Sequence, residues 1–352
     1  MRKMPVTAGA ESLQDQLDRE RRLVSFDSYD LSVRQLVEMF DSGEIEVPPE
    51  YQRQFIWRPD RESELIESVM LGIPVPSLFM ATNRDSTWEI VDGVQRLSTL
   101  AHFMGTNTLL KKVKREKPLC IEGLEKLSAL NGTSHENLPR PIQLMFSTRP
   151  MRVTVLNDKS DLNVRFDLFE RLNTGGISLT NQEIRNCVFR GPFNDDLKTL
   201  ATNEHFTATI KLKESDKNNG TLEELVLRFF AYLEKYTEFE HSVKGFLNDY
   251  MKSKSTSPVS KSQRTVFAKT FELLHQSLPF GISRKTKGVT PLNLFEAISV
   301  GTALAIQTNQ PLSLKRLPKL LDNPQLKGLT AGGTNNRKMV TGRIEFVRNA
   351  LL

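Results

Sequence analysis

The chain has 352 residues, a formal net charge of +6 and a pI near 9.2. Its composition, 38% hydrophobic and 26% charged, is that of a globular protein and excludes a disordered chain. It has no run of about 18 apolar residues and no signal-peptide segment, so we expect a cytoplasmic protein with no membrane partner. Cys120 and Cys187 are too few for a disulfide framework, and the five histidines lack metal-binding spacing.

The pattern of predicted elements indicates an α+β fold in two domains. Residues 1–20 are polar and charge-rich, which predicts a loose arm or an exposed helix. Residues 21–200 predict short strands mixed with amphipathic helices, whereas in residues 201–352 strand signals nearly vanish and helix starts recur. We therefore expect an α+β domain at 21–200 and a mostly α-helical domain at 201–352.

Alternation and turn residues predict the strands, and capping residues predict the helix starts. The segments 77–82 and 87–91 are expected to pair as a hairpin, followed by a helix at 94–104. Further strands are predicted at 23–26, 44–47 and 151–155, and a further helix at 161–172. Helix caps are predicted at Ser32, Asp60, Thr180, Thr221 and Thr290.

The segment from Trp88 to Leu100 is predicted to run from a strand through a tight glycine turn into a helix. Such a turn exposes the first N–H groups of the helix, which together with the helix dipole favour phosphate. Arg96 adds a charged fork for phosphate oxygens, and Asp92 offers a carboxylate for Mg²⁺ or for orienting a water. The alternative is a capping box, in which Asp92 caps the helix and Gln95 reaches back.

Two other segments show polar and aromatic residues at close spacing. Residues 49–58 (PEYQRQFIWR) combine aromatics with arginines, which suits contact with a nucleotide or a DNA strand, or else forms a surface loop pinned by Phe55 and Trp57. Residues 169–176 (FERLNTGG) lead a helix into paired glycines, which permits close approach to a ligand or simply ends the helix. Basic clusters, including the one at 111–117, predict either contact with a nucleic-acid backbone or a solvated surface.

Together these segments resemble the N-terminal domain family of GmrSD-type (type IV) restriction endonucleases, within the ParB/sulfiredoxin-like nucleotidase group. The resemblance rests on PPEYQR at 48–53, DGVQR at 92–96, FERLNTGG at 169–176 and LTNQEIRN at 179–186. It implies a ParB/sulfiredoxin-like nucleotidase core followed by a helical extension. It also implies binding of an NTP, ATP or GTP, with Mg²⁺, and in several members hydrolysis that governs recognition or cutting of modified DNA.

The resemblance and the residue chemistry assign site roles by position. The catalytic group is Asp92, Gln95 and Arg96, with Asp92 also the metal ligand. Nucleotide contacts are assigned to Tyr51, Gln52, Arg53, Gly93, Ser98, Asn173, Gly175 and Gly176. DNA contacts are assigned to Arg58, Lys111, Lys112, Lys114 and Arg115.

The sequence departs from the family pattern in two places. Val94 stands where the family commonly has glutamine, and the loss of that amide puts hydrolysis in doubt more than binding. The full restriction enzymes carry a C-terminal HNH nuclease, whose histidine pairing this chain lacks, so we expect no HNH chemistry here. Sulfiredoxin chemistry is also excluded, because neither cysteine lies near the phosphate turn.

We therefore expect an NTP-binding subunit, hydrolysing NTP, in an anti-phage defence or DNA-restriction system. Its expected partners are DNA and a nuclease or another subunit of the defence system, and a homo-oligomer is left open. One alternative is a non-enzymatic DNA-binding or adaptor protein with a degenerate nucleotidase site. Another is a nuclease or glycosylase that acts directly on modified DNA through Asp92 or Glu50.

Overall fold

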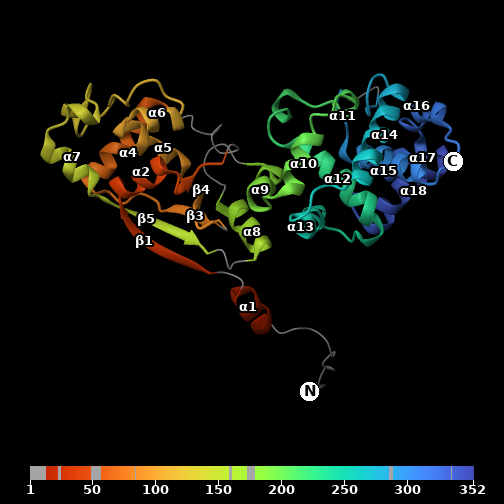
Figure 1. Cartoon of the computed structure of the whole chain (residues 1–352), viewed down its shortest axis with the longest axis horizontal. Coiled ribbons are helices and arrows are strands. Elements are labelled where there is room, and N and C mark those ends of the chain that lie inside the picture. Colours follow the sequence, from red (N-terminus) through yellow and green to blue (C-terminus); the bar gives the residue numbers. More distant parts are fainter. Residues whose placement is uncertain are drawn as a thin grey trace, which may run out of the picture. The chain divides into compact units, whose positions relative to one another are not determined.

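The computed structural model describes residues 13–22, 25–48, 57–83, 85–157, 161–172, 179–284, 288–333 and 335–352, without the side chains of 19–22. The chain divides into two compact units, unit 1 at residues 1–179 and unit 2 at residues 180–352. Unit 1 combines strands and helices, whereas the described residues of unit 2 are helical (Figure 1). The fold class is therefore α+β, as the sequence predicts.

Unit 1 is built on a five-stranded sheet of β1 (Phe26–Ser32), β2 (Ile45–Glu46), β3 (Leu78–Thr82), β4 (Trp88–Asp92) and β5 (Pro150–Leu156). The strand order is β1-β5-β3-β4-β2. The pairs β1–β5 and β3–β4 are antiparallel, and the pairs β3–β5 and β2–β4 are parallel. The sheet is therefore mixed, and the hairpin predicted at 77–91 is confirmed as β3 and β4.

The helices α2, α4 and α5 gather on one side of this sheet (Figure 1). Their apolar faces supply the core of unit 1, with Leu36, Ile66 and Leu97 fully buried. These faces follow the spacing of three and four residues that the sequence shows. The helices of unit 1 are α1 (Leu13–Arg22), α2 (Val33–Ser42), α4 (Pro59–Leu71), α5 (Val94–Met104), α6 (Asn107–Lys112), α7 (Arg140–Ser147) and α8 (Leu162–Leu172), with 3-10 turns at Ser128–Leu130 and His135–Asn137.

Unit 2 packs its helices around α15 (Leu292–Gln307), which is buried along almost its whole length. Gly301 lets α18 approach α15 closely, because a Cβ there would lie 2.7 Å from Cβ of Val347. No described helix of the chain is both long and apolar enough to cross a membrane. The other helices are α9 (Asn181–Val188), α10 (Pro192–Leu200), α11 (Glu204–Thr209), α12 (Thr221–Lys235), α13 (Val243–Lys254), α14 (Lys261–Ser277), α16 (Leu317–Leu320), α17 (Pro324–Leu329) and α18 (Arg337–Leu351), with 3-10 turns at Glu214–Asp216, Tyr236–Glu238 and Leu314–Arg316.

The capping boxes predicted at Ser32 and Thr180 are confirmed, since each side chain accepts the N–H three residues further on. The other three predicted caps are wrong by one or two positions. Asp60 is the second residue of α4, Thr221 is the first residue of α12, and Thr290 precedes the residue that caps α15. In each case an adjacent proline or glycine determines where the helix begins.

Candidate functional site

The motif at 92–96 lies at the turn where β4 ends and α5 begins. Beside it the pairing of β3 with β4 shifts register, so that Phe79 lies opposite Asp92 while Met80 lies opposite Ile90. Between these two pairs β4 therefore has one residue more than β3. An extra residue of this kind, a β-bulge, bends a strand and changes the direction of the side chain that follows, and it often occurs beside ligand sites. Gly93, with φ of 99°, then serves as the N-cap of α5. A single residue therefore joins the strand to the helix.

Asp92 and Arg96 form an ion pair across this turn. Asp92 Oδ2 accepts a hydrogen bond from Arg96 Nη2 at 2.8 Å, and the same nitrogen donates to the carbonyl of Ser77 at 3.2 Å. Arg96 Nε is buried and has no hydrogen-bond acceptor among the described residues. The guanidinium is therefore held beside the start of α5, with part of its donor capacity unused.

Gly93 makes this close arrangement sterically possible. A Cβ at this position would lie 2.4 Å from Cδ2 of Leu78 and 2.9 Å from Nη2 of Arg96. Both distances are too short for a real side chain, so the turn requires glycine for space as well as for its left-handed backbone. The sequence predicts the glycine turn, but it does not show that Arg96 packs against it.

The alternative prediction of a capping box formed by Asp92 and Gln95 is wrong. Gly93 is the N-cap, and α5 has no side-chain cap. The Oε1 atom of Gln95 instead accepts the backbone N–H of Trp57 at 3.3 Å. With glycine at its N-cap, the described start of α5 has no side-chain cap, and the helix dipole makes this end favourable for an anion.

A buried ionic cluster connects α4, α5 and the segment after α6. The carboxylate of Glu62 is fully buried, with Oε2 2.5 Å from Nδ1 of His102 and Oε1 3.2 Å from Nη2 of Arg115. Arg115 Nη2 also donates to the carbonyl of Trp57 at 3.3 Å, and His102 Nε2 lies 3.0 Å from the carbonyl of Lys117. Sequence reasoning missed Glu62 and His102, because they are 40 residues apart and belong to no recognisable motif.

A small basic pocket of about 70 Å³ opens beside the first two turns of α5. Ser98, assigned to the nucleotide from sequence, lines it together with Lys112, Lys114 and Arg115, which were assigned to DNA. The structure therefore brings residues with separately predicted roles to one place. The remaining lining residues are Phe40, Val47, Val94 and Val113.

Of the predicted DNA contacts that the structure describes, Arg58 and Lys111 do not line this pocket. Arg58 is exposed and pairs with Asp60 at 2.7 Å, and Lys111 is exposed at the end of α6. The residues Glu50, Tyr51, Gln52, Arg53, Asn173, Gly175 and Gly176 lie outside the described residues.

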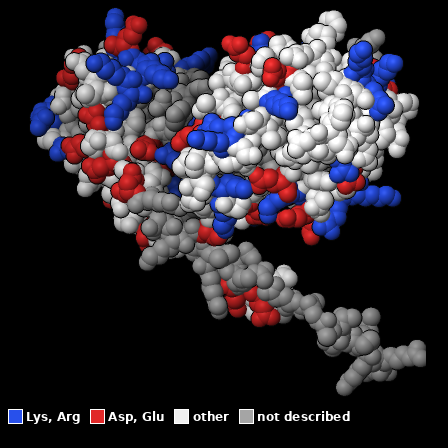
Figure 2. Space-filling model, turned by 45° about the vertical axis from the view of Figure 1, so that its right-hand side comes forward, with Lys and Arg blue, Asp and Glu red and all other residues white. Residues whose placement is uncertain are grey.

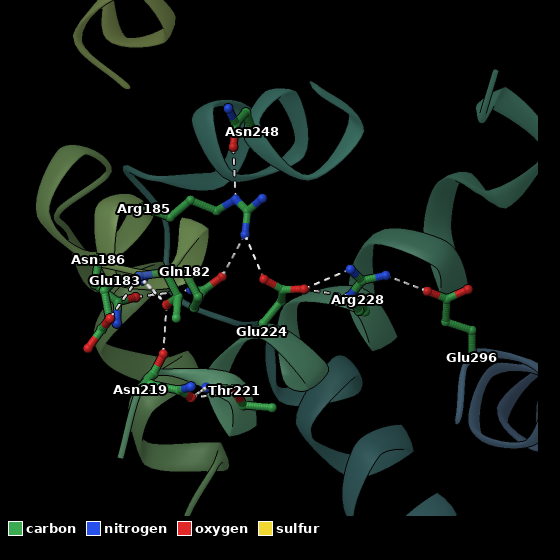
Figure 3. A network of polar contacts seen from close by, with 11 residues as sticks. Gln182, Glu183, Arg185, Asn186, Asn219, Thr221, Glu224, Arg228, Asn248 and Glu296 are labelled. Atoms are coloured by element: carbon green, nitrogen blue, oxygen red, sulfur yellow. Dashed lines mark hydrogen bonds and ion pairs between the residues drawn. The ribbon is translucent and has the colours of Figure 1, made fainter. Parts of the chain in front are cut away.

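The motif at 179–186 forms one end of a buried polar network in unit 2 (Figure 3). The guanidinium of Arg185 is 1% exposed, and its Nε donates to Oδ1 of Asn248 at 2.8 Å. Its Nη1 donates to Oε1 of Gln182 and to Oε2 of Glu224, both at 3.1 Å. These contacts attach α9 to α12 and α13.

The network continues from Glu224 to the C-terminal helix. Arg228 donates to Glu224 Oε1 from Nε at 2.8 Å and from Nη2 at 2.7 Å, and its Nη1 donates to Glu296 Oε1 at 2.6 Å. Glu296 Oε2 in turn accepts from Arg343 of α18. Burial alone would raise the pKa of Glu224, but Arg228 and Arg185 together hold that pKa below its ordinary value. Alternating charges therefore join α9, α12, α15 and α18.

The fit of Mg²⁺ to the predicted ligand Asp92 depends on which of its oxygens is available. The described residues contain no group of three or more His, Cys, Asp or Glu side chains placed to hold a metal ion. Asp92 uses Oδ2 for Arg96, which leaves Oδ1 to offer a metal. Mg²⁺ often takes one or two protein carboxylates and fills its other positions with water and phosphate oxygens. Asp92 therefore fits Mg²⁺ when a triphosphate supplies further ligands.

Two histidines that are far apart in sequence meet in unit 2. Nδ1 of His205 lies 3.0 Å from Nδ1 of His275, joining α11 to α14. Sequence spacing could not reveal this pair, because the two residues are 70 positions apart.

Comparison with known proteins identifies a family for the first part of the chain. Residues 33–190 match the family described as GmrSD restriction endonuclease, N-terminal domain. The matched range begins at the first residue of α2 and includes four of the five described strands, the Asp92–Arg96 turn and α9. No curated protein matches the chain.

Proposed function

Residues 33–190 belong to the family of GmrSD restriction endonuclease N-terminal domains, and on this basis we propose that the chain is the NTP-binding subunit of a DNA-restriction or anti-phage defence system. The family indicates a component of such a system that acts on DNA. We further propose a ParB/sulfiredoxin-like nucleotidase core that takes ATP or GTP with Mg²⁺. Cleavage of DNA is assigned to a partner chain.

The observation that carries the proposal is the uncapped N-terminus of α5 with the Arg96 guanidinium beside it. Backbone N–H groups at a helix start and a planar guanidinium are the donors that phosphate oxygens prefer. The small basic pocket along α5 adds the positive charges of Lys112, Lys114 and Arg115. Together these groups favour an anion such as phosphate at this end of α5.

The ion pair gives Asp92 and Arg96 distinct roles in this proposal. Arg96 would bind a phosphate oxygen through guanidinium N–H groups that do not pair with Asp92. Asp92 would present Oδ1 to Mg²⁺ or to an attacking water. Mg²⁺, when bound with the nucleotide, supplies neutralisation of the developing phosphate charge.

Val94 favours a second candidate function, binding without turnover. The side chain is buried and lines the basic pocket, so an apolar group stands where the family commonly has an amide. Such a site would keep the phosphate donors but lack one group for positioning water. Without that group, the chain would be a non-enzymatic, nucleotide-gated DNA-binding or adaptor protein.

Measurement of NTP affinity and of phosphate release, with Mg²⁺ and with and without DNA, separates these functions. Arg96→Ala is expected to weaken NTP binding by about tenfold or more, because a charge-assisted hydrogen bond contributes roughly 1.5–3 kcal/mol. Asp92→Asn is expected to retain binding and to abolish release. No binding at millimolar NTP in the presence of DNA would contradict the proposal, and binding without release would establish the second candidate.

A pair of lysine variants tests the basic pocket. Lys114 lines the pocket, whereas Lys111 is exposed three residues earlier and does not. Lys114→Gln is expected to weaken NTP binding about tenfold, and Lys111→Gln, with the same change in charge, to leave it nearly unchanged. Equal effects would indicate a general electrostatic attraction without a pocket.

The DNA-binding surface is proposed on the basic residues Arg58 and Lys111, which are exposed. On the face shown in Figure 2, Lys and Arg side chains gather at the top of the left-hand part, with Asp and Glu mostly below them. We expect DNA binding to weaken as salt is raised, because contacts with phosphates release counterions. Strand breaks or abasic sites made by the protein alone would instead support direct nuclease or glycosylase action.

A further inference from the structure

Unit 2 contains a second cavity that the proposed NTP site does not use. It has a volume of about 330 Å³, near the lower end of the roughly 300–1,000 Å³ range of ligand pockets. Its walls come from α9, α12, the start of α15 and the segment that includes Lys211 and Lys213. We call it the Glu224 pocket, after the carboxylate that lines it.

The carboxylate of Glu224 gives the pocket a fixed hydrogen-bond acceptor. Glu224 Oε1 accepts two N–H groups of Arg228, whereas Oε2 accepts one N–H group of Arg185 (Figure 3). A carboxylate has about four acceptor positions, so Oε2 retains one. The side chain is 20% exposed, which leaves it reachable from the cavity. Gln182 lies beside it with its own groups bonded to Asn186 and Arg185.

Two lysines and a second carboxylate also line the pocket. Lys211 and Lys213 are the two lysines. The side-chain oxygen of Thr290 accepts the backbone N–H of Lys211 at 2.9 Å, so the hydroxyl hydrogen of Thr290 points away from that N–H. Asp216 also lines the pocket, but its Oδ1 accepts from Ser215 at 2.9 Å. Among the charged residues that line the cavity, Lys211 and Lys213 balance Asp216 and Glu224, and Glu224 is itself paired with Arg185 and Arg228. An anionic group is therefore favoured beside the two lysines.

The pocket also has apolar lining residues, which are Leu212, Leu225, Val289 and Leu292. Nζ of Lys211 lies 6.0 Å from the ring centroid of Phe280, which is 78% exposed. A flat ring can bury its faces against such walls while its edge reaches the carboxylate.

We propose that the Glu224 pocket binds a single nucleotide unit, with its base N–H donating to Glu224 and its phosphate at Lys211 and Lys213. A nucleotide joins a flat, N–H-bearing ring to an anion, and the lining of the pocket combines apolar side chains, a carboxylate acceptor and two lysines, which suit these parts. The unit has two possible sources, a free mononucleotide or one residue of a nucleic-acid strand. The pocket lies in unit 2, so this site is separate from the one proposed at Asp92 and Arg96.

Calorimetric titration of the full chain with AMP, GMP and a single-stranded hexanucleotide tests the proposal. All titrations use the Arg96→Ala background, so that failure of the proposed NTP site leaves the result unaffected. The double variant Lys211→Gln with Lys213→Gln is expected to weaken binding at least tenfold, since each phosphate contact contributes about that factor. Binding of the mononucleotide indicates a free ligand, and binding of the hexanucleotide alone indicates a strand.

Two further variants separate the pocket from general charge effects. Lys217 lies on the same segment but pairs with Glu214 and does not line the cavity, so Lys217→Gln is expected to bind as the background does. Leu292→Trp places a larger side chain in the cavity from the half-exposed start of α15, and it is expected to abolish binding. Absence of binding at millimolar ligand, or binding that neither the lysine pair nor Leu292→Trp alters, would overturn the proposal.

Discussion

At the turn between β4 and α5, the side chains of Leu78 and Arg96 occupy the space that a side chain at position 93 would need. The sequence could predict this turn, because a glycine between a strand pattern and a helix pattern is typical of a tight connection. It could not distinguish a cap from an ion pair, since Asp92 is equally suited to both. In the structure the ion pair with Arg96 forms beside a register shift between β3 and β4, which local pattern does not show.

Gly93→Ala tests the close approach at this turn. We expect it to lower the free energy of unfolding by about 2–4 kcal/mol, because left-handed strain adds to overlap with Leu78 and Arg96. Gly43→Ala is the matched control, with φ of +89° but nothing within 4 Å of the added Cβ, and it should cost only the strain, about 1 kcal/mol. Equal losses in urea denaturation would show that the contacts at Gly93 contribute nothing.

Glu62→Gln tests the ionic cluster beneath the site. We expect it to lower the free energy of unfolding by about 3–5 kcal/mol, because it removes the charge facing buried His102 and half-buried Arg115. Glu64→Gln, an exposed position on the same helix, should leave unfolding nearly unchanged. Tryptophan fluorescence can follow both variants, since Trp57 and Trp88 both lie in unit 1. A loss below about 1 kcal/mol for Glu62→Gln would contradict the cluster's role.

At the scale of elements, predictability follows the strength of the apolar pattern. The hairpin β3–β4 and helix α5 were predicted within one residue, because buried side chains repeat at strand and helix spacing there. β1 was not, since its residues 27–32 are mostly polar and exposed and are held by pairing with β5. The network from Arg185 to Arg343 was also unpredictable, because its partners come from four helices and have no common spacing.

Glu296→Gln tests whether the network stabilises unit 2. Glu296 is fully buried between Arg228 and Arg343, so removing its charge should lower the free energy of unfolding by about 3–5 kcal/mol. Glu214→Gln removes an exposed partner of Lys217 and serves as the control that should change little. If both variants unfold at the same urea concentration, the buried charges do not contribute to stability.

Acidification should weaken the same network. The pKa of Glu224 is held below its ordinary value by Arg228 and Arg185 against the effect of burial. An acid with a depressed folded-state pKa contributes stability that is complete above its unfolded-state pKa and is lost as pH falls through the folded-state value. Urea denaturation of residues 180–352 should therefore show a loss below about pH 4.5 that Glu224→Gln reduces. An unchanged pH profile in that variant would assign the acid sensitivity to other groups.

At the scale of the whole molecule, the family match and the structural division do not end at the same residue. The match ends at 190, whereas the units divide between 179 and 180. Helix α9 is therefore matched with the first unit but packs in the second, where Arg185 bonds Glu224 and Asn248. Sequence reasoning placed the change in character at 200/201, because helical pattern alone cannot show which neighbours a helix contacts.

Truncation tests which boundary describes folding. The fragment 180–352 is expected to unfold cooperatively, whereas 191–352 lacks α9, exposes its apolar contacts and leaves Glu224 without Arg185. We expect 191–352 to be less stable by at least about 3 kcal/mol or to aggregate. Equal stability of the two fragments in thermal unfolding would show that α9 does not belong to unit 2.

The position of α9 also gives the chain a natural chemical reporter. Its two cysteines are divided between the units, with Cys120 exposed in unit 1 and Cys187 buried in α9. A maleimide or iodoacetamide should label Cys120 at once and Cys187 only when α9 leaves its packing, because alkylation requires access to the thiolate. The rate of the second labelling, followed by intact-mass spectrometry, then measures the opening of unit 2 in the unmodified sequence, and a ligand that stabilises this unit should slow it.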